Sequence, residues 1–281
     1  MKITVIGVGL IGGSMALKLK AKGFASFVFG VDQNENHLFE AKKLGIIDEI
    51  ATLEHAVKNS DLIIIAIPVD AAKKILPGVL DLANQQQTFM DAGSTKSGIV
   101  NSVKNHPNRN RFVAFHPMWG TENSGPQSAS SESFEGRAAV ICDREHSAED
   151  ALRTVEQAAE NLDMHLIYMN AADHDLHAAY ISHISHITSY ALANTVLEKE
   201  REEDTIFQLA STGFSSTVRL AKSHPEMWVP IFKQNKENVL DVLNEHISQL
   251  RKFKSALEKE NYDLLEDLIR NANKIRGILD K

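Results

Sequence analysis

The chain has 281 residues and a formal net charge of -7, from 30 basic and 37 acidic side chains. Hydrophobic residues make up 43% of it and charged residues 24%, as in globular proteins, which excludes disorder, collagen and a coiled-coil rod. The negative charge disfavours nucleic acid and anionic membrane as partners, and no run of about 18 apolar residues could span a bilayer. The single cysteine, Cys142, cannot form an internal disulfide. We expect a cytoplasmic globular protein that binds small molecules.

Short apolar runs alternate with helical patterns in the first half of the chain. Strand-like runs at 2–6 and 27–31 are each followed by a helical pattern, at 10–22 and 34–44. The run at 62–67 is apolar without alternation, as in a central strand with helices on both faces. Further strands are expected at 88–90, 112–115, 138–141 and 166–168. This order predicts an α/β fold with a Rossmann-type parallel sheet.

The second half of the chain has a different character. Of 15 glycines, 13 precede Arg137, so tight turns belong to the first half and long helices fit the second. Asn170 can cap a helix whose first turn contains Asp173, and apolar positions then recur at helical spacing. We therefore expect a Rossmann domain at 1–169 and an all-helical domain at 170–281.

The last part of this helical domain carries two apolar stripes. One consists of Val239, Leu243, Ile247, Leu250 and Leu257, and the other of Leu264, Leu265, Leu268, Ile269, Ile275 and Leu279. Long helices with such stripes often pack against a partner subunit. We expect a homodimer formed through these C-terminal helices.

A glycine motif follows the first expected strand and begins the first expected helix. Gly7, Gly9 and Gly12 fit the pattern G-x-G-x-x-G. The first glycine permits a tight turn, the second lets backbone amides approach a pyrophosphate, and the third lets helix and strand pack closely. Leu10 and Ile11 open the helix, whose amino terminus offers free N–H groups to a phosphate. The motif predicts a dinucleotide cofactor; the alternative is a glycine turn without a ligand.

An acidic residue stands where such cofactors place the adenosine ribose. Asp32 ends the second expected strand, 20 residues beyond Gly12. Its carboxylate would accept hydrogen bonds from ribose hydroxyls and would repel a 2'-phosphate, and no arginine adjoins it, so NAD is favoured over NADP. Pro68, directly after the strand at 62–67, is assigned to the same cofactor site.

Reactive side chains follow two further strands at the same edge of the sheet. His116 follows the strand at 112–115 and can act as general base for an alcohol, because imidazole titrates near neutral pH. Ser94 follows the strand at 88–90 and could hydrogen-bond the same hydroxyl. The alternatives are a loop histidine bonded to backbone and a serine that caps a helix starting near Thr95.

Two cationic side chains have different interpretations. Arg219 lies between Val218 and Leu220, and its guanidinium could clamp a carboxylate through paired hydrogen bonds. The alternative is an ordinary surface arginine. Lys96 is interpreted as a solvated helix residue.

The start of the helical domain is rich in histidine. At helical spacing, two imidazoles project from one core-facing stripe, which consists of His183 and His186 with Leu176, Ala179, Ile187 and Tyr190. Because buried polar groups need partners, a substrate carboxylate, a metal or core hydrogen bonds could satisfy them. Although His174 and His177 lie nearby, no known metal-ligand spacing is present, and no metal is expected.

Together these motifs are similar to those of a known family. They are G-V-G-L-I-G-G-S at 7–14, D-A-G-S-T-K at 91–96, H-P-M-W-G-T-E at 116–122 and S-H-I-S-H at 182–186. With them the chain resembles the prephenate dehydrogenase family, which includes arogenate and cyclohexadienyl dehydrogenases. The resemblance covers nearly the whole chain and implies an NAD-binding domain followed by a helical domain that forms a homodimer.

The resemblance also implies an activity and residue roles. Ser94 and His116 would hold the ring hydroxyl of prephenate, with His116 taking its proton, and Arg219 would bind a substrate carboxylate. The other substrate-binding residues are Ser182, His183, His186 and Glu122, the last at the pocket entrance. Hydride transfer to NAD and loss of carbon dioxide would give 4-hydroxyphenylpyruvate on the way to tyrosine.

The chain departs from the family pattern at several positions, so alternatives stay open. Many members have proline at Ser185, arginine and aspartate at Ser215 and Ser216, and a small residue at Trp119. These departures alter the pocket wall, so arogenate could replace prephenate as substrate. A 3-hydroxy acid dehydrogenase would have a similar architecture but relies on a lysine early in the helical domain. A catalytically silent NAD-binding dimer is the alternative outside enzymes.

Overall fold

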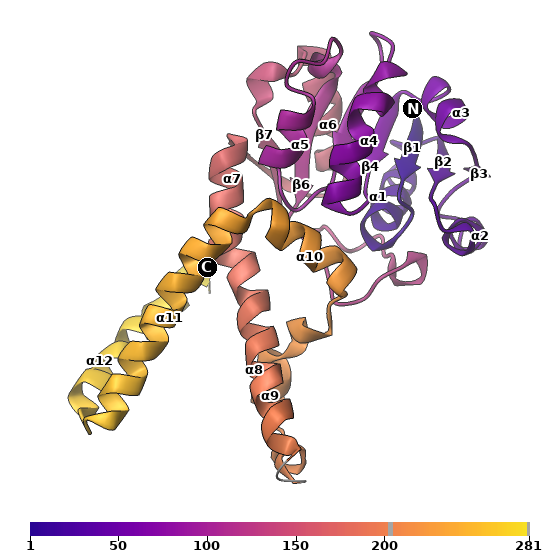
Figure 1. Cartoon of the computed structure of the whole chain (residues 1–281). Coiled ribbons are helices and arrows are strands. Elements are labelled where there is room, and N and C mark those ends of the chain that lie inside the picture. The colour runs from indigo at the N-terminus through magenta and orange to yellow at the C-terminus, as the bar shows by residue number, and fades with distance from the viewer. Residues whose placement is uncertain (202–204, 280–281) are drawn as a thin grey trace. The chain divides into compact units, whose positions relative to one another are not determined.

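The computed structural model describes residues 1–201 and 205–279 (Figure 1). By packing, the described chain falls into two compact units, Met1–Asn235 and Lys236–Lys281. The domain boundary expected near Asn170 stays a prediction.

The first unit is built on one sheet. Within the described residues its eight strands lie in the order β3-β2-β1-β4-β5-β6-β7-β8. They are β1 (Lys2–Ile6), β2 (Phe27–Val31), β3 (Glu49–Ile50), β4 (Leu62–Ile65), β5 (Thr88–Asp91), β6 (Phe112–Pro117), β7 (Ala138–Cys142) and β8 (His165–Met169). Neighbouring strands are parallel except β6 and β7, which are antiparallel. The order of the first six strands is that of a Rossmann sheet, which confirms the predicted fold class.

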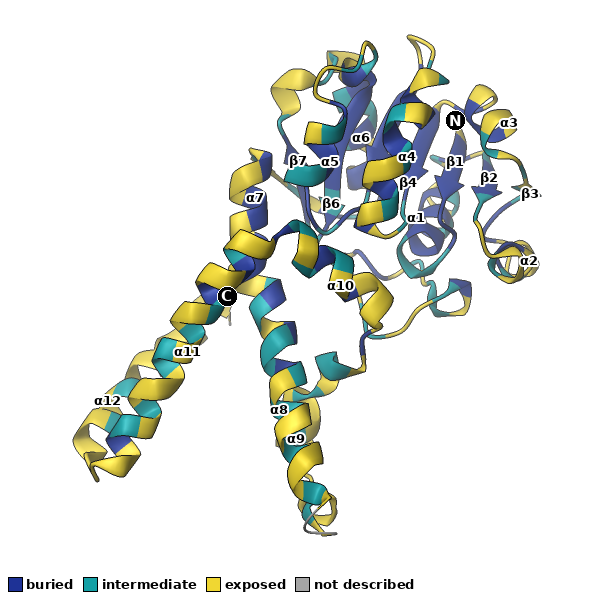
Figure 2. Ribbon diagram, in the orientation of Figure 1, coloured by how far each residue is buried: buried dark blue, intermediate teal, exposed yellow. Residues whose placement is uncertain are grey.

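Helices cover both faces of this sheet (Figure 1). They are α1 (Leu10–Ala21), α2 (Glu35–Lys43), α3 (Leu53–Lys58), α4 (Val69–Asp81), α5 (Ser97–Ser102) and α6 (Glu149–Asn161). Along β4, Ile64 joins the core beneath α1 and α6, whereas Ile63 and Ile65 join the core beneath α4 and α5. Strand β4 is accordingly buried on both sides (Figure 2), as its unbroken apolar run predicts, whereas the edge strands β3 and β8 are partly exposed.

The helical segment that follows β8 begins as predicted but changes its winding. Asn170 caps α7 (Ala171–Ala178) by accepting a hydrogen bond from Asp173 N at 2.8 Å. A π-helical turn, η4 (Ala179–His183), then leads into α8 (Ile184–Glu200). Because a π turn adds a residue to the winding, it shifts the helical phase. The expectation that Leu176 shares the core-facing stripe of His183 is therefore wrong: Leu176 is 37% exposed.

The next segment folds back onto the sheet domain. It consists of η5 (Ile206–Leu209), α9 (Thr212–Thr217), η6 (Arg219–Lys222) and α10 (Pro225–Gln234). Helix α10 packs against α4, and its Trp228 and Ile231 join the core beneath that helix. Three other short turns are η1 (Arg109–Arg111), η2 (Pro126–Ser128) and η3 (Arg144–His146).

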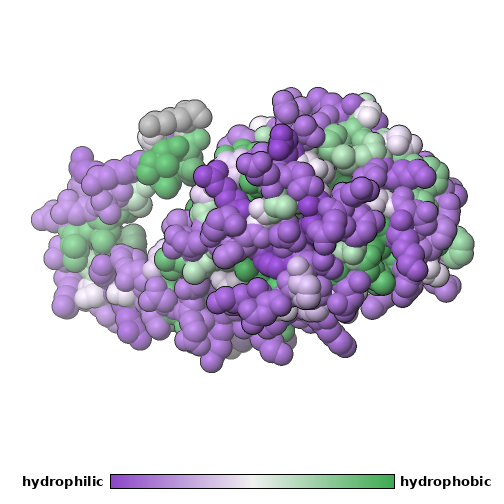
Figure 3. All heavy atoms as spheres, turned by 90° about the horizontal axis from the view of Figure 1, so that it is seen from above, coloured by the Kyte–Doolittle hydropathy of each residue, from purple (hydrophilic) through white to green (hydrophobic). Residues whose placement is uncertain are grey.

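The second unit consists of helices with exposed apolar side chains. They are α11 (Lys236–Glu258), α12 (Tyr262–Ala272), η7 (Asn273–Ile275) and α13 (Arg276–Leu279). Several residues of the predicted stripes are exposed, among them Leu250, Leu257, Ile269 and Leu279. Apolar side chains that reach the surface are visible as green spheres in Figure 3. None of the helices among the described residues is both long and apolar enough to cross a membrane.

The glycine turn between β1 and α1 is shaped by close packing. Gly7 has a φ of +95°, which side chains other than hydrogen rarely allow. A Cβ atom at Gly12 would lie 2.1 Å from the carbonyl oxygen of Gly7, whereas one at Gly9 would meet no atom within 4 Å. Thus Gly12 lets helix and strand pack, and Gly9 leaves the turn open.

We expect Gly12→Ala to lower the free energy of unfolding by about 3 kcal/mol or more, because its methyl group must displace backbone. Gly9→Ala is the matched control and should cost less than about 1 kcal/mol. Urea unfolding followed by circular dichroism measures both. Equal stability of the two variants would contradict this account of the turn.

Candidate active site

The dinucleotide motif lies where the strand order reverses between β1 and β4. Asp32 follows β2 and fastens the motif, because its Oδ2 accepts a hydrogen bond from Val8 N at 3.0 Å. Its Oδ1 accepts from Asn34 N at 2.9 Å. Pro68 follows β4 and begins α4. In open parallel sheets ligands bind at such a reversal, outside the carboxyl ends of the strands.

Helix α1 presents its amino terminus to this edge. Leu10 and Ile11 form its first turn and are half-buried. Within the described chain Gly9 provides no side-chain cap, and that first turn holds no acidic residue. Its backbone N–H groups and the positive end of the helix dipole are therefore available to a phosphate.

Ser94 and His116 occupy the neighbouring strand ends. Strand β6 includes His116 and ends at Pro117, two residues beyond the expected end at 115. Helix α5 begins at Ser97 rather than near Thr95, so Ser94 does not cap it. The Ser94 side chain is half-buried, and its hydroxyl makes no hydrogen bond among the described residues.

His116 is the first member of a hydrogen-bonded series. Its Nδ1 lies 2.8 Å from Nε2 of His174, whose own Nδ1 lies 2.9 Å from Oδ1 of Asp175. Because a carboxylate can only accept, His174 carries its proton on Nδ1 and accepts at Nε2. His116 must then donate from Nδ1, which leaves its Nε2 as an unprotonated base.

Burial and charge favour this protonation pattern. Burial, followed by the nearby His174, Lys96 and His183, lowers the pKa of His116 well below 6.5. Burial alone would raise the pKa of Asp175, but hydrogen bonds from His174, Lys96 and Ser97 lower it overall. At neutral pH a neutral imidazole therefore lies in series with a carboxylate.

Asp175 also joins α7 to the sheet domain. Its Oδ1 accepts from Lys96 N at 2.7 Å and its Oδ2 from Ser97 N at 2.9 Å, so it caps α5 from another helix. His174 and Asp175 were not assigned to the site from the sequence. The sequence does contain a signal for them: an acid follows a histidine in α7, a helix that begins directly after a strand of the sheet.

Lys96 differs from its sequence interpretation. It is not a solvated helix residue: its side chain and that of Asp91 are both 0% exposed and form an ion pair. The interpretation was wrong because a lysine is buried only where an acid and further acceptors surround it, which the sequence did not reveal.

The two histidines of the η4–α8 segment lie among aromatic side chains. His186 stacks on Trp228 with ring centroids 3.4 Å apart, and its Nδ1 lies 3.1 Å from the backbone oxygen of Ser182. His183 is 1% exposed, and its Nδ1 lies 3.2 Å from Nδ2 of Asn235. Burial lowers the pKa of His183 to about 4. Burial and, to a smaller extent, the charge of Arg219 lower the pKa of His186.

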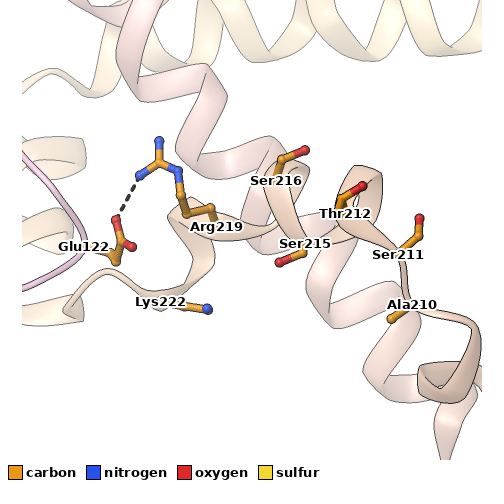
Figure 4. A pocket seen from close by; sticks show the side chains of 8 residues that line it. All are labelled: Glu122, Ala210, Ser211, Thr212, Ser215, Ser216, Arg219 and Lys222. Carbon is orange, nitrogen blue, oxygen red and sulfur yellow. Dashed lines mark hydrogen bonds and ion pairs between the residues drawn. The ribbon is translucent and has the colours of Figure 1, made fainter.

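Glu122 and Arg219 meet in a pocket of about 510 Å³. Arg219 Nη1 donates to Glu122 Oε2 at 2.9 Å, which brings the loop after β6 against η6 (Figure 4). The pocket is lined by Glu122, Ala210, Ser211, Thr212, Ser215, Ser216, Arg219 and Lys222. The backbone of Glu122 and its bond to Arg219 lower the pKa of that carboxyl.

Ser94 and His116 are not among the residues that line this pocket. Among the residues described, no three His, Cys, Asp or Glu side chains come together as a metal site.

Comparison with known families identifies both halves of the chain. Residues 15–168 match the family model described as the nucleotide-binding domain of prephenate dehydrogenase. Residues 170–271 match the model described as its dimerization domain. The chain belongs to the prephenate dehydrogenase family. This confirms the resemblance based on the motifs.

Individual members of the prephenate dehydrogenase family match over nearly the whole chain. The prephenate dehydrogenase of Bacillus subtilis is 30% identical over 98% of this chain and 76% of its own length. The cyclohexadienyl dehydrogenase of Zymomonas mobilis is 27% identical over 98% of this chain and 94% of its own. The crystal structure of A. aeolicus prephenate dehydrogenase with hydroxyphenyl propionate and NAD+ has a TM-score of 0.90 at 29% identity, covering 99% of this chain and 98% of that one.

The low pKa of buried His183 predicts a pH-dependent stability. Its pKa is about 4 in the folded protein and near 6.5 when unfolded, so the unfolded chain binds the proton more tightly. Stability from this group is complete above about pH 6.5 and is lost as the pH falls towards 4, by up to about 3 kcal/mol. His183→Gln should reduce this loss in urea unfolding across that range.

The control for this measurement is His146→Gln, since His146 is an exposed residue of η3. It should retain the pH dependence of the unaltered protein. If His183→Gln loses as much stability between neutral and acidic pH as this control does, His183 is not held neutral by the fold.

Proposed function

We propose that this protein is a prephenate dehydrogenase that uses NAD to convert prephenate into 4-hydroxyphenylpyruvate and carbon dioxide in tyrosine biosynthesis. The series His116–His174–Asp175 carries the proposal, because it places an unprotonated imidazole nitrogen at the sheet edge that bears the dinucleotide motif. Membership of the prephenate dehydrogenase family supports the choice of reaction.

The residues of the motif fit NAD. The open space at Gly9 and the uncapped start of α1 suit a pyrophosphate, beside Gly7, Leu10, Ile11 and Gly12. Asp32 lies where the ribose of the adenosine half belongs and disfavours a 2'-phosphate, and Pro68 lines the neighbouring strand end. When bound, NAD supplies the hydride acceptor.

The chain's own residues bind and deprotonate the substrate. Ser94 and His116 hold the ring hydroxyl, and Nε2 of His116 accepts its proton as the ring carbon is oxidised. The imidazolium that forms is stabilised through His174 by the carboxylate of Asp175. The carbon–carbon bond to the ring carboxylate then breaks and carbon dioxide leaves. The electron pair of that bond completes the aromatic ring, and the imidazolium of His116 returns its proton to the ring oxygen.

Charge in the pocket favours a substrate with two carboxylates. Arg219 and Lys222 bring two positive charges to it, and Glu122, the acid among its described lining residues, is already paired with Arg219. Prephenate carries two carboxylates, whereas arogenate also carries an ammonium that needs an acceptor. We therefore place prephenate ahead of arogenate. The roles of Ser182, His183 and His186 in substrate binding rest on the family resemblance, since these residues do not line this pocket.

The homodimer is proposed on two grounds. The match at residues 170–271 is to a dimerization domain, and apolar side chains of α11 to α13 are exposed in the single chain. A second copy would cover them. The helical domain at 170–281 would thus serve both dimerisation and substrate binding. The cytoplasmic location expected from the lone cysteine stays a prediction.

The proposed reaction is tested by incubating the purified protein with NAD and prephenate. We expect NADH to form together with 4-hydroxyphenylpyruvate, and arogenate to be used with lower kcat/KM. His116→Asn should lower kcat by about 10² to 10⁴, because the general base is lost. NADH absorbance and chromatography of the product measure this.

Other results would contradict the proposal. Turnover of neither cyclohexadiene, with oxidation of a 3-hydroxy acid instead, would assign the chain to the related dehydrogenases. Tight NAD binding that is unaffected by His116→Asn, with no turnover of any of these substrates, would indicate a silent NAD-binding dimer.

Arg219→Ala should raise KM for prephenate about tenfold or more while changing the affinity for NAD little, because a charge-assisted hydrogen bond to a carboxylate is lost. Arg153→Ala makes the same change in charge on the exposed face of α6 and is the control. Steady-state kinetics with each substrate varied in turn measure both. If KM for NAD rises as much as KM for prephenate, Arg219 has a structural role.

A further inference from the structure

A buried ion pair holds the backbone of the residue that precedes His116. The side chains of Asp91 and Lys96 are both 0% exposed, at the end of β5 and in the turn that follows. Removing two charges from water costs several kcal/mol per ion, and a buried ion pair is often no more stabilising than apolar side chains of similar size. Its presence at this point therefore calls for a reason other than stability.

Asp91 and Lys96 connect β5 to β6 beyond the point where the paired residues of these two strands end. The register of β5 and β6 pairs Phe89 with Phe112 and Met90 with Val113 and then stops. Beyond it, Asp91 Oδ1 accepts from Phe115 N at 3.2 Å, and Lys96 Nζ donates to Phe115 O at 2.6 Å. Both polar groups of the residue before His116 are thus held by side chains.

The second carboxylate oxygen of Asp91, Oδ2, holds the turn that carries Ser94. Asp91 Oδ2 accepts from Lys96 Nζ and also from Gly93 N, the latter at 2.9 Å. Beyond the last paired residues of β5 and β6, the backbone next to Ser94 and the backbone next to His116 are therefore both held by Asp91 and Lys96.

The backbone N–H of Lys96 is also connected to His116, through a series of hydrogen bonds. Lys96 N donates to Asp175, which holds His174, which in turn contacts Nδ1 of His116. One residue therefore fixes both the backbone before His116 and the partner of its imidazole. An error of about 1 Å in the position of a catalytic group can cost about 10²-fold in rate.

We propose that Lys96, paired with Asp91, is a positioning residue that sets the place of His116 and keeps its imidazole neutral for proton transfer. This inference rests on the proposed function. The charged or titratable groups that face His116 are Lys96 from the β5–α5 turn, His174 from α7 and His183 from η4. Lys96 opposes a positive charge on the imidazole, so its loss makes His116 easier to protonate.

The test is the double variant Asp91→Asn with Lys96→Met. It removes both charges at once, so that no buried charge is left unpaired and the chain should still fold. We expect kcat to fall about 10- to 100-fold while the affinity for NAD changes by less than about threefold. Because the two charges of the pair act on His116 in opposite directions, the acid limb of the kcat profile should move little in this variant. An equal loss of kcat and NAD affinity would overturn the proposal, as would unchanged kinetics.

A control variant removes an ion pair elsewhere. Lys18 is 9% exposed, and its Nζ lies 2.6 Å from Asp163, whose side chain is 33% exposed and also pairs with Lys22. Lys18→Met with Asp163→Asn should keep kcat and the pH profile. If this control lowers kcat as far as the Asp91 and Lys96 variant does, the effect is not specific and the proposal fails.

Lys96→Gln removes the charge of Lys96 alone and leaves the Asp91 carboxylate without its cationic partner. Its amide can still donate towards Phe115 O, so kcat should fall less than in the double variant, whereas the acid limb should move to higher pH. A wild-type acid limb in Lys96→Gln would overturn the part assigned to charge. Asp91→Asn with Lys96→Gln leaves no charge unpaired and serves if the first double variant does not fold; kcat should again fall while the affinity for NAD changes little.

A substrate-free measurement distinguishes this inference from the proposed function. In histidine-labelled protein, the NMR titration of His116, assigned with His116→Asn, should move to higher pH in Lys96→Gln. If the wild-type protein does not oxidise prephenate, the proposed function fails, yet this titration still reports on Lys96. An unchanged titration midpoint would overturn the inference whether or not prephenate is oxidised.

Discussion

The carboxylate of Asp175 is the interaction on which the candidate active site depends. It accepts from Lys96 N and Ser97 N at the start of α5 and from the imidazole of His174. The backbone oxygen of Asp175 accepts a hydrogen bond of 2.6 Å from Nδ2 of Asn235, which lies at the end of α10. A single residue thus fastens the first helix after β8 to the turn after β5 and to the last residue of the compact unit. Without it, α5 would lose its cap and His174 the acceptor that fixes its tautomer.

The fold could be predicted where the deciding interactions are local. An unbroken apolar run marked β4, and Asn170 three residues before Asp173 marked the start of α7. Strand direction is not local, because an apolar run such as β7 reads the same whether its neighbour is parallel or antiparallel. The π turn at η4 was missed for a similar reason, since it shifts the phase of a helix without a distinctive composition.

The candidate site was predictable at its strand ends and not at its supports. Ser94 and His116 stand directly at the carboxyl ends of strands, where the sheet topology itself assigns a ligand. Their supports lie far along the chain: His174 is 58 residues from His116, and Asp175 is 79 residues from Lys96. No spacing rule links such pairs. Lys96 was misread because lysine is almost always solvated, and only the fold brings Asp91 and Phe115 O around it.

In the proposed function, the distribution of charge would separate substrate binding at Arg219 from proton transfer at His116. Permanent charge that can attract an anion lies at Arg219, whose side chain is 51% exposed, and at Lys222 in the same pocket. The imidazoles deeper in the fold are held neutral, because burial lowers the pKa of His116, His183 and His186. A charged base at depth would have to be neutralised before it could accept a proton, whereas a neutral imidazole becomes cationic only as the proton arrives. The compensating carboxylate of Asp175 is separated from His116 by the imidazole of His174. At that distance it stabilises the cation without repelling an anionic substrate at close range.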